Sequence, residues 1–305
     1  MGSIPPINPL KMITMKKITF IAALLVSIQG FAQNGSNLTQ FTPSALLGKG
    51  QYEIQSFNNL YSQNSVRNAE GDKIDLGQRQ IFLSSMFMFT YGVSNNSKLN
   101  VGLDVNVNRA RYTDGSAGAL GIFGNNEGDF TRTVISTIGP RVKFSPLNAV
   151  PRLSVQSAFW IPVADDLESP RFVTHDRYTW WTQIFYDRSF GTNWQLFLQL
   201  DFLYRFKTQE IQENFFRTPV SAFLSYFPNA NSTVFIMAQH SPAFGRVEVG
   251  DQSEYGRLRW FSQIGIGAKY QLTRQLGVEL SYANFIASRN DGAGQTVNLG
   301  FRFIK

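Results

Sequence analysis

Apolar and polar residues alternate along most of this chain. The alternation is clearest at residues 99–107. The apolar positions there are Leu99, Val101, Leu103, Val105 and Val107. A period of two predicts a β-strand with one apolar and one polar face. Residues 79–91 have the same period, and only the Ser- and Asn-rich residues 92–98 separate the two stretches, so together they predict a β-hairpin.

The same alternation recurs in about twelve segments, and no helical period competes with it. The predicted strands are 51–62, 76–91, 98–112, 131–144, 152–163, 178–189, 194–206, 218–227, 232–240, 258–272, 276–285 and 295–304. Short and long connections alternate between them, which is typical of the periplasmic turns and extracellular loops of outer-membrane barrels. We therefore predict an all-β fold, a single antiparallel transmembrane β-barrel in the outer membrane of a Gram-negative cell, with both termini periplasmic.

The N-terminal residues predict export. Lys16 and Lys17 precede the apolar run 18–28, and small residues follow it up to Ala32, which is the order of regions in a signal peptide. The run is too short to span a membrane as a helix. Met15 lies immediately before the lysines and is the better start site. The predicted divisions are a signal peptide at 1–32, a periplasmic or lumenal lead-in at 33–50, and the barrel at 51–305.

The amino-acid composition is consistent with a transmembrane barrel that has lipid on one face and water on the other. Aromatic residues make up 14% of the 305 residues and charged residues only 16%. The formal net charge is +7, but the predicted signal peptide carries lysines and no acid, so the basic excess does not indicate nucleic-acid binding. The absence of cysteine excludes a disulfide framework and a thiolate metal site. No motif predicts a cofactor.

Two stretches resemble known exported barrels. They are residues 48–63, GKGQYEIQSFNNLYSQ, and residues 90–105, TYGVSNNSKLNVGLDV. They are similar to stretches of outer-membrane barrels of about twelve strands that are described as transporters of unassigned substrate. Some of those proteins are grouped in a loosely defined family associated with phenol-degradation gene clusters. The resemblance implies the fold and a transport role, and it carries over no site residue.

The parity of each strand assigns its side chains to lipid or to the lumen. The predicted lipid-facing residues include Leu99, Val101, Leu103, Val105, Val107, Leu196, Leu198, Leu200, Phe301 and Phe303, and Val134, Ile138 and Val142 are placed on the same outer face. The predicted charged residues of the lumen are Asp104, Arg141, Lys143, Asp187, Asp201, Arg205, Arg257, Arg259, Lys269, Glu279 and Arg302. These charges either select a solute or pair with one another and plug the barrel. Phe197 and Phe261 share the inner parity, which favours an apolar or aromatic solute.

Three features predict contacts with the membrane and with the cell's assembly apparatus. Arg109 and Arg111 continue the outer parity above the apolar band, where cations meet lipopolysaccharide phosphates or remain solvated at the rim. The aromatic final strand, ending in Phe303, resembles the signal that the outer-membrane assembly machinery reads. Lipid itself is the predicted partner of the apolar band. The sequence predicts no oligomeric state.

Catalytic and metal-binding residues are sparse. The histidines are His175 and His240, and Ser241 follows His240 directly, but adjacent residues of a strand point to opposite faces. A Ser or Thr within hydrogen-bond reach of either histidine would favour an enzyme. Acidic residues cluster at 165–168 without the spacing of a calcium loop, so we expect solvated charge and no metal site. Glycine-rich residues 115–128 precede no helix and predict no phosphate site.

The sequence thus predicts a passive channel or transporter for a small, apolar or aromatic solute. One alternative is a non-conducting structural or adaptor barrel that binds partners through its loops. A second is an outer-membrane lipid-modifying enzyme.

Overall fold

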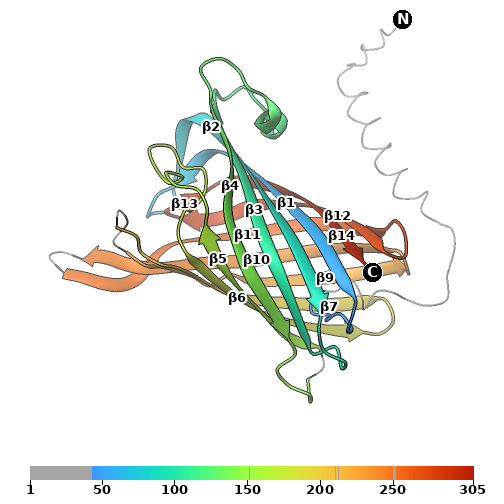
Figure 1. Ribbon diagram of the computed structural model, residues 1–305. Helices are drawn as coiled ribbons and strands as arrows, with labels where there is room; N and C mark the ends of the chain where they lie inside the picture. The colour runs from blue at the N-terminus through green and yellow to red at the C-terminus, as the bar shows by residue number, and fades with distance from the viewer. Residues whose placement is uncertain (1–42, 151, 210, 212, 250–251) are drawn as a thin grey trace, which may run out of the picture. The chain divides into compact units, whose positions relative to one another are not determined.

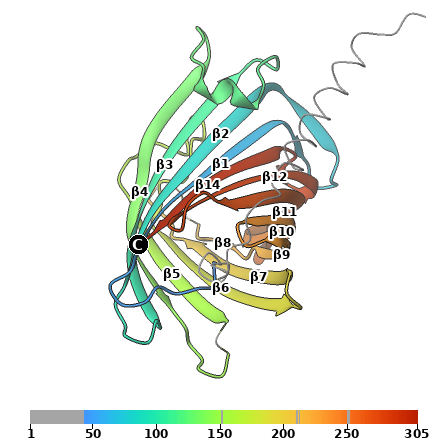
Figure 2. The ribbon, with the colours of Figure 1, turned by 90° about the vertical axis from the view of Figure 1, so that its right-hand side faces the viewer.

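The computed structural model describes residues 43–305 except 151, 210, 212, 250 and 251, with the side chains of 247–249 and 252–254 also left out. All of these residues belong to the unit Asn37–Lys305. Its strands form one antiparallel sheet that closes into a barrel (Figures 1 and 2).

Twelve strands form the wall of the barrel. They are β1 (Tyr52–Arg67), β2 (Lys73–Gly92), β3 (Leu99–Thr113), β4 (Phe130–Phe144), β5 (Leu153–Pro162), β6 (Thr179–Phe190), β7 (Trp194–Arg205), β9 (Val220–Asn229), β10 (Ser232–Val249), β11 (Gln252–Gln271), β12 (Leu276–Arg289) and β14 (Gln295–Ile304). The short strands β8 (Phe215–Arg217) and β13 (Asp291–Gly292) add to the wall at its extracellular end, and η2 (Ala119–Phe123) is a 3₁₀ helix. Among the described residues, no helix is long and apolar enough to cross a membrane.

The barrel closes where the first strand meets the last. β1 pairs with β2 on one side and with β14 on the other, from Glu53 opposite Ile304 to Ser62 opposite Gln295. β8 spans part of the gap between β7 and β10, while β7 also pairs directly with β9. Closure leaves no free sheet edge, so backbone groups at membrane depth are paired within the wall.

One predicted loop is wrong. Residues 241–257 are predicted to form a long extracellular loop, but β10 continues to Val249 and β11 begins at Gln252, and the two strands pair up to these residues. Pro242 and Gly245 hide the alternation there, and a register shift lies between Ala243 and Phe244. The resulting hairpin, orange in Figure 1, extends past the neighbouring strands. The short strands β8 and β13 were not predicted either.

The predicted outward position of Val134 is also wrong. β3 and β4 shift register between Asn106 and Val107, where Val107 pairs with Ile135 and Asn106 with Thr137. This bulge reverses the parity of β4 on its extracellular side. Ile135 is therefore exposed, while Val134 packs inside the barrel against a buried cluster of Ala110, Tyr112, Leu167 and Val173. A bulge inserts one residue and re-aims the side chains beyond it.

Candidate functional site: the barrel lumen

The lumen contains a cavity of about 490 Å³, within the size range of sites for small molecules. Inward residues of most wall strands line it, because alternate residues of each strand point inward. The predicted charged residues that line it are Asp104, Arg141, Lys143, Asp201, Lys269, Glu279 and Arg302. Phenylalanine, methionine and glutamine side chains complete the lining, so the cavity is neither purely polar nor purely apolar.

Four phenylalanines form a continuous row across neighbouring strands of the cavity wall. They are Phe185 on β6, Phe197 on β7, Phe223 on β9 and Phe235 on β10, and we call them the phenylalanine row. Successive ring centroids are 5.8, 5.6 and 5.9 Å apart. Lys143 lies 5.6 Å from the ring centroid of Phe185, and Lys269 lies 5.5 Å from that of Phe235. The row thus has an ammonium group at each end, in cation–π geometry.

Two ion pairs lie on or near the seam, which is the pairing of β1 with β14 that closes the barrel: one joins β1 to β14 and the other joins β3 to β4. Glu53 accepts a hydrogen bond from Arg302 across the β1–β14 pairing. Arg141 lies 3.4 Å from Asp104, to which Trp160 also donates a hydrogen bond of 3.1 Å. Pairing offsets the desolvation of charges in the barrel interior.

The other two acidic residues that line the cavity are Glu279, which forms an ion pair, and Asp201, which accepts hydrogen bonds from glutamines. Lys269 and Glu279 pair at 2.9 Å on β11 and β12. Asp201 faces the cavity and accepts hydrogen bonds from Gln199 at 2.9 Å and Gln183 at 3.4 Å. It forms no ion pair with any described residue. Pairing therefore neutralises most, though not all, of the charges that sequence parity placed in the lumen.

Residues 43–50 run into the periplasmic mouth of the barrel, and we call them the mouth segment. Asn100 accepts a hydrogen bond of 2.9 Å from the main-chain N–H of Leu47 and donates one of 3.0 Å to its carbonyl. Lys143 donates to the carbonyls of Pro43 and Ala45, and Ser44 donates to Asp187. Because Pro43, Ala45 and Leu47 also line the cavity, this segment narrows the lumen from the periplasmic side.

Arginines crowd the extracellular end of the lumen around Phe215. The guanidinium carbons of Arg205, Arg217 and Arg259 lie 5.2, 5.7 and 4.9 Å from the centroid of its ring. Arg217 pairs with Asp291 at 2.7 Å. The guanidinium groups of Arg205 and Arg259 make neither a hydrogen bond nor an ion pair with any described residue. We call these three residues, together with Arg177, the arginine cluster.

The loop at 163–178 contributes the rest of this end. Arg177 pairs with Glu168 at 2.9 Å, and His175 Nδ1 lies 3.0 Å from the same carboxylate. Burial, and then the positive charge of Arg205, lower the pKa of His175 to about 3. The imidazole is therefore neutral at neutral pH. Two of the four arginines form ion pairs with the carboxylates of Glu168 and Asp291, so the other two guanidinium groups of the arginine cluster have no ion-pair partner among the described residues.

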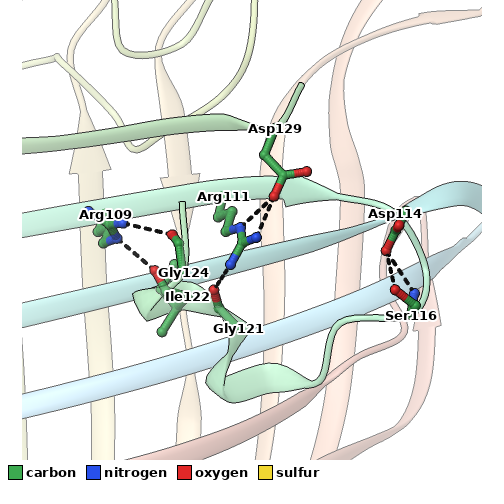
Figure 3. A network of polar contacts seen from close by, with 8 residues as sticks. All are labelled: Arg109, Arg111, Asp114, Ser116, Gly121, Ile122, Gly124 and Asp129. Carbon is green, nitrogen blue, oxygen red and sulfur yellow. Dashed lines mark hydrogen bonds and ion pairs between the residues drawn. The ribbon is translucent and has the colours of Figure 1, made fainter. Parts of the chain in front are cut away.

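Arg109 and Arg111 bind the protein's own loop (Figure 3). Arg109 donates to the carbonyls of Ile122 at 2.7 Å and Gly124 at 3.2 Å. Arg111 is only 2% exposed; it donates to the carbonyl of Gly121 and pairs with Asp129. Sequence parity predicted that both side chains lie on the outer face of the barrel, but it could not predict that residues of the loop after β3 cover them there. The guanidinium of Arg111 is thus not available to a lipopolysaccharide phosphate.

The outer wall brings a serine to one histidine. His240 and Ser262 are cross-strand partners on β10 and β11, and His240 Nδ1 lies 2.9 Å from Ser262 Oγ. The sequence argued against the neighbour Ser241 and indicated no other serine, because the register that selects Ser262 cannot be deduced from one strand. No described carboxylate contacts the imidazole, whose ring lies 5.5 Å from that of Trp260. Among the described residues, no group of three acidic or histidine side chains is placed to hold a metal.

The remaining predicted positions can now be placed. Asp187 lies at the periplasmic mouth, where Gln195 donates to it at 2.9 Å. Leu99, Val101, Leu103, Leu198 and Phe301 are 38–44% exposed. The partly exposed members of the predicted outer face are Val105, Val107, Leu196, Leu200 and Phe303.

A closed antiparallel barrel with an apolar outer belt and a charged lumen defines an outer-membrane β-barrel protein. No protein-family model matches the sequence, and no curated protein matches it. Among solved structures, the fold is similar to the COG4313 outer membrane channel from Pseudomonas putida F1, with a TM-score of 0.65 and 12% identity over 86% of this chain and 98% of that one. It is also similar to the β-domain of the Bordetella autotransporter Brka, with a TM-score of 0.55 and 10% identity over 83% of this chain and 98% of that one.

Proposed function

We propose that this barrel is a passive channel for small aromatic solutes, with a preference for those that carry a negative charge. The phenylalanine row is the observation that carries the proposal. It places four neighbouring aromatic rings along one side of a cavity of about 490 Å³. Conduction requires binding at several sites, each weak enough to release the solute. Aromatic pairs, each contributing about 0.5–1.5 kcal/mol beyond the burial of their area, meet that requirement.

The preference for anions is supported by charge. The arginine cluster lies at the extracellular end of the lumen, and two of its guanidinium groups, Arg205 and Arg259, have no acidic partner among the described residues. A site lined by one sign of charge raises the local concentration of the opposite ion. Of the lysines at the two ends of the phenylalanine row, Lys269 pairs with Glu279, whereas Lys143 forms no ion pair with a described residue and offers the next positive group along the path. The first solute to test is therefore benzoate.

The experiment is single-channel recording from the purified mature chain in a planar bilayer. We expect a steady conductance that benzoate blocks more strongly than acetate does. Phe197→Leu, which shortens the phenylalanine row, should weaken the block by benzoate. Phe87→Leu is the matched control, because Phe87 is 47% exposed on the outer face of the barrel and should leave the block unchanged. Equal block by benzoate in both variants would contradict the aromatic path.

A non-conducting structural barrel is the competing proposal, and the mouth segment and the arginine cluster at the two ends of the lumen support it. It predicts a correctly folded protein that carries no current with or without solute. Solute flux into proteoliposomes would then be absent too, and the loops would be the place to look for a partner.

The pair of His240 and Ser262 favours a second candidate function, a lipid hydrolase. Ser262 Oγ would attack an ester carbonyl while His240 takes its proton, and His240 would return that proton to the alcohol as the ester C–O bond breaks. Water, deprotonated by His240, would then hydrolyse the acyl-serine and release the fatty acid. The pair lies on the outer wall, where lipid is present. The test is release of fatty acid from phospholipid vesicles by the wild-type protein and by Ser262→Ala. Activity that this substitution abolishes would establish the enzyme; equal, background release from both would exclude it.

A further inference from the structure

The loop between β3 and β4, residues 114–129, folds against the outside of the barrel, and we call it the outer-wall loop. Its 3₁₀ helix η2 places Ile122, which is fully buried, against Leu60 and Ile81. These two residues have the outward parity of their strands, since the alternate residues Phe57 and Met86 line the cavity. The apolar contact therefore lies on the outer surface of the wall.

Two arginines fix the backbone of this loop. Arg109 and Arg111 donate hydrogen bonds to the carbonyls of Gly121, Ile122 and Gly124 (Figure 3). An unpaired carbonyl is costly wherever water is excluded. The contacts thus provide partners for loop carbonyls that lie close to the membrane.

The other side of η2 is apolar and is exposed, because little of the described protein packs against it. Leu120 is 73% exposed and Phe123 is 69% exposed, the highest values among the large hydrophobic side chains that the structure describes. They flank the buried Ile122 in sequence, so η2 presents one apolar side to the wall and a second one away from it.

The register places η2 at the upper edge of the membrane. Tyr91, near the periplasmic end of β2, is exposed on the outer face, and Ile81 lies ten residues further along the strand. Ten residues span about 33 Å along a strand. With a tilt of about 40° this corresponds to about 25 Å of height, which is the height of the apolar band of an outer-membrane barrel. Ile81 and the helix packed on it therefore lie where the acyl chains meet the head groups.

We propose that the outer-wall loop is a membrane anchor, in which Leu120 and Phe123 insert into the acyl chains of the outer leaflet. Lipid is the occupant because the exposed apolar side of η2 is continuous with the lipid-facing belt below it. Leu83 and Val297 flank the buried contact, and Phe87 and Leu299 extend the exposed belt downward on the same strands. Leu and Phe are among the side chains that interfacial anchors bury at the boundary of head groups and acyl chains.

The absence of native cysteine makes the test direct. Single spin labels are attached to Leu120→Cys and Phe123→Cys in the full mature chain, reconstituted in phosphatidylcholine vesicles. Leu103→Cys on the outer belt is the lipid reference. Ser116→Cys, exposed in the same loop, is the aqueous reference. Relaxation by oxygen, which concentrates in lipid, is compared with relaxation by a water-soluble nickel chelate. Resistance of each labelled barrel to denaturation by detergent on an unheated gel confirms that it is folded.

The proposal predicts that labels at 120 and 123 respond to oxygen more than to nickel, as the label at 103 does, while the label at 116 shows the reverse. Nickel accessibility at 120 and 123 equal to that at 116 would overturn it, since the side chains would then be in water. Protection from both reagents would overturn it too, because that result means a protein partner or a second copy covers η2.

Discussion

Asn100 is the residue whose replacement tests the mouth segment most cleanly. Its amide both accepts from and donates to the main chain of Leu47, at 2.9 and 3.0 Å, and its side chain is 1% exposed. Each hydrogen bond contributes a net stabilisation of about 0.5–1.5 kcal/mol. Asn100→Leu removes both while keeping the number and branching of the side-chain heavy atoms, so we expect the segment to lose about 1–3 kcal/mol of its binding free energy. The population of the released segment should rise about 5- to 150-fold.

Trypsin cleavage after Lys49, an exposed residue of the segment, measures that population in the folded barrel. Single-channel recording provides the second readout, because release of residues that line the cavity should raise the mean conductance. Asn106→Leu is the matched control. Asn106 lies on the same strand and face, and its amide binds Thr137 at 2.7 Å instead of the segment. Equal cleavage rates and equal conductance in the two variants would show that the segment is not held by Asn100.

Other predictions follow from the wall, the final strand and the extracellular end. Leu103→Arg should cost about 2–4 kcal/mol of folding free energy in lipid vesicles because the residue faces mid-membrane lipid; unchanged stability would remove its lipid-facing assignment. Phe303→Ser should slow insertion by purified assembly machinery, and a normal rate would show that the final aromatic residue is not read. Arg259→Gln should shift the reversal potential in a salt gradient toward weaker anion preference, whereas Lys305→Gln, outside the strands, should not. The pKa of His175 is lowered on folding from about 6.5 to about 3, so stability should fall as pH decreases below about 6.5; His175→Phe should flatten that part of the pH profile of unfolding.

The fold could be predicted from the sequence because a lipid-exposed wall requires a strict period of two. Strand 99–107 illustrates this, since both its faces and its partner were evident from alternation alone. The wrong predictions concern segments in which a bulge, a proline or a glycine interrupts the alternation. The bulge near Thr137 reversed the parity of Val134, and Pro242 and Gly245 concealed the extension of β10.

The lumen was less predictable than the wall. Parity identified inward residues such as Asp104 and Asp201, but the phenylalanine row depends on the relative heights of four strands. Register sets those heights, and a single sequence does not contain it. For the same reason the partner of His240 was missed. The prediction for Arg111 was incomplete for another reason. Parity placed its side chain on the outer face of the barrel, but its partners there, Gly121 and Asp129, belong to a loop that the strand pattern does not describe.

The seam ion pair has a consequence for how the protein is made. Glu53 and Arg302 are 249 positions apart in the chain, so synthesis must be almost complete before the first of them can meet the second. Only when β1 meets β14 does the attraction between the carboxylate and the guanidinium offset the desolvation of these two charges. A chain that ends prematurely cannot form this contact. The seam thus distinguishes finished barrels from unfinished ones by charge, and places that check at the last step of biosynthesis.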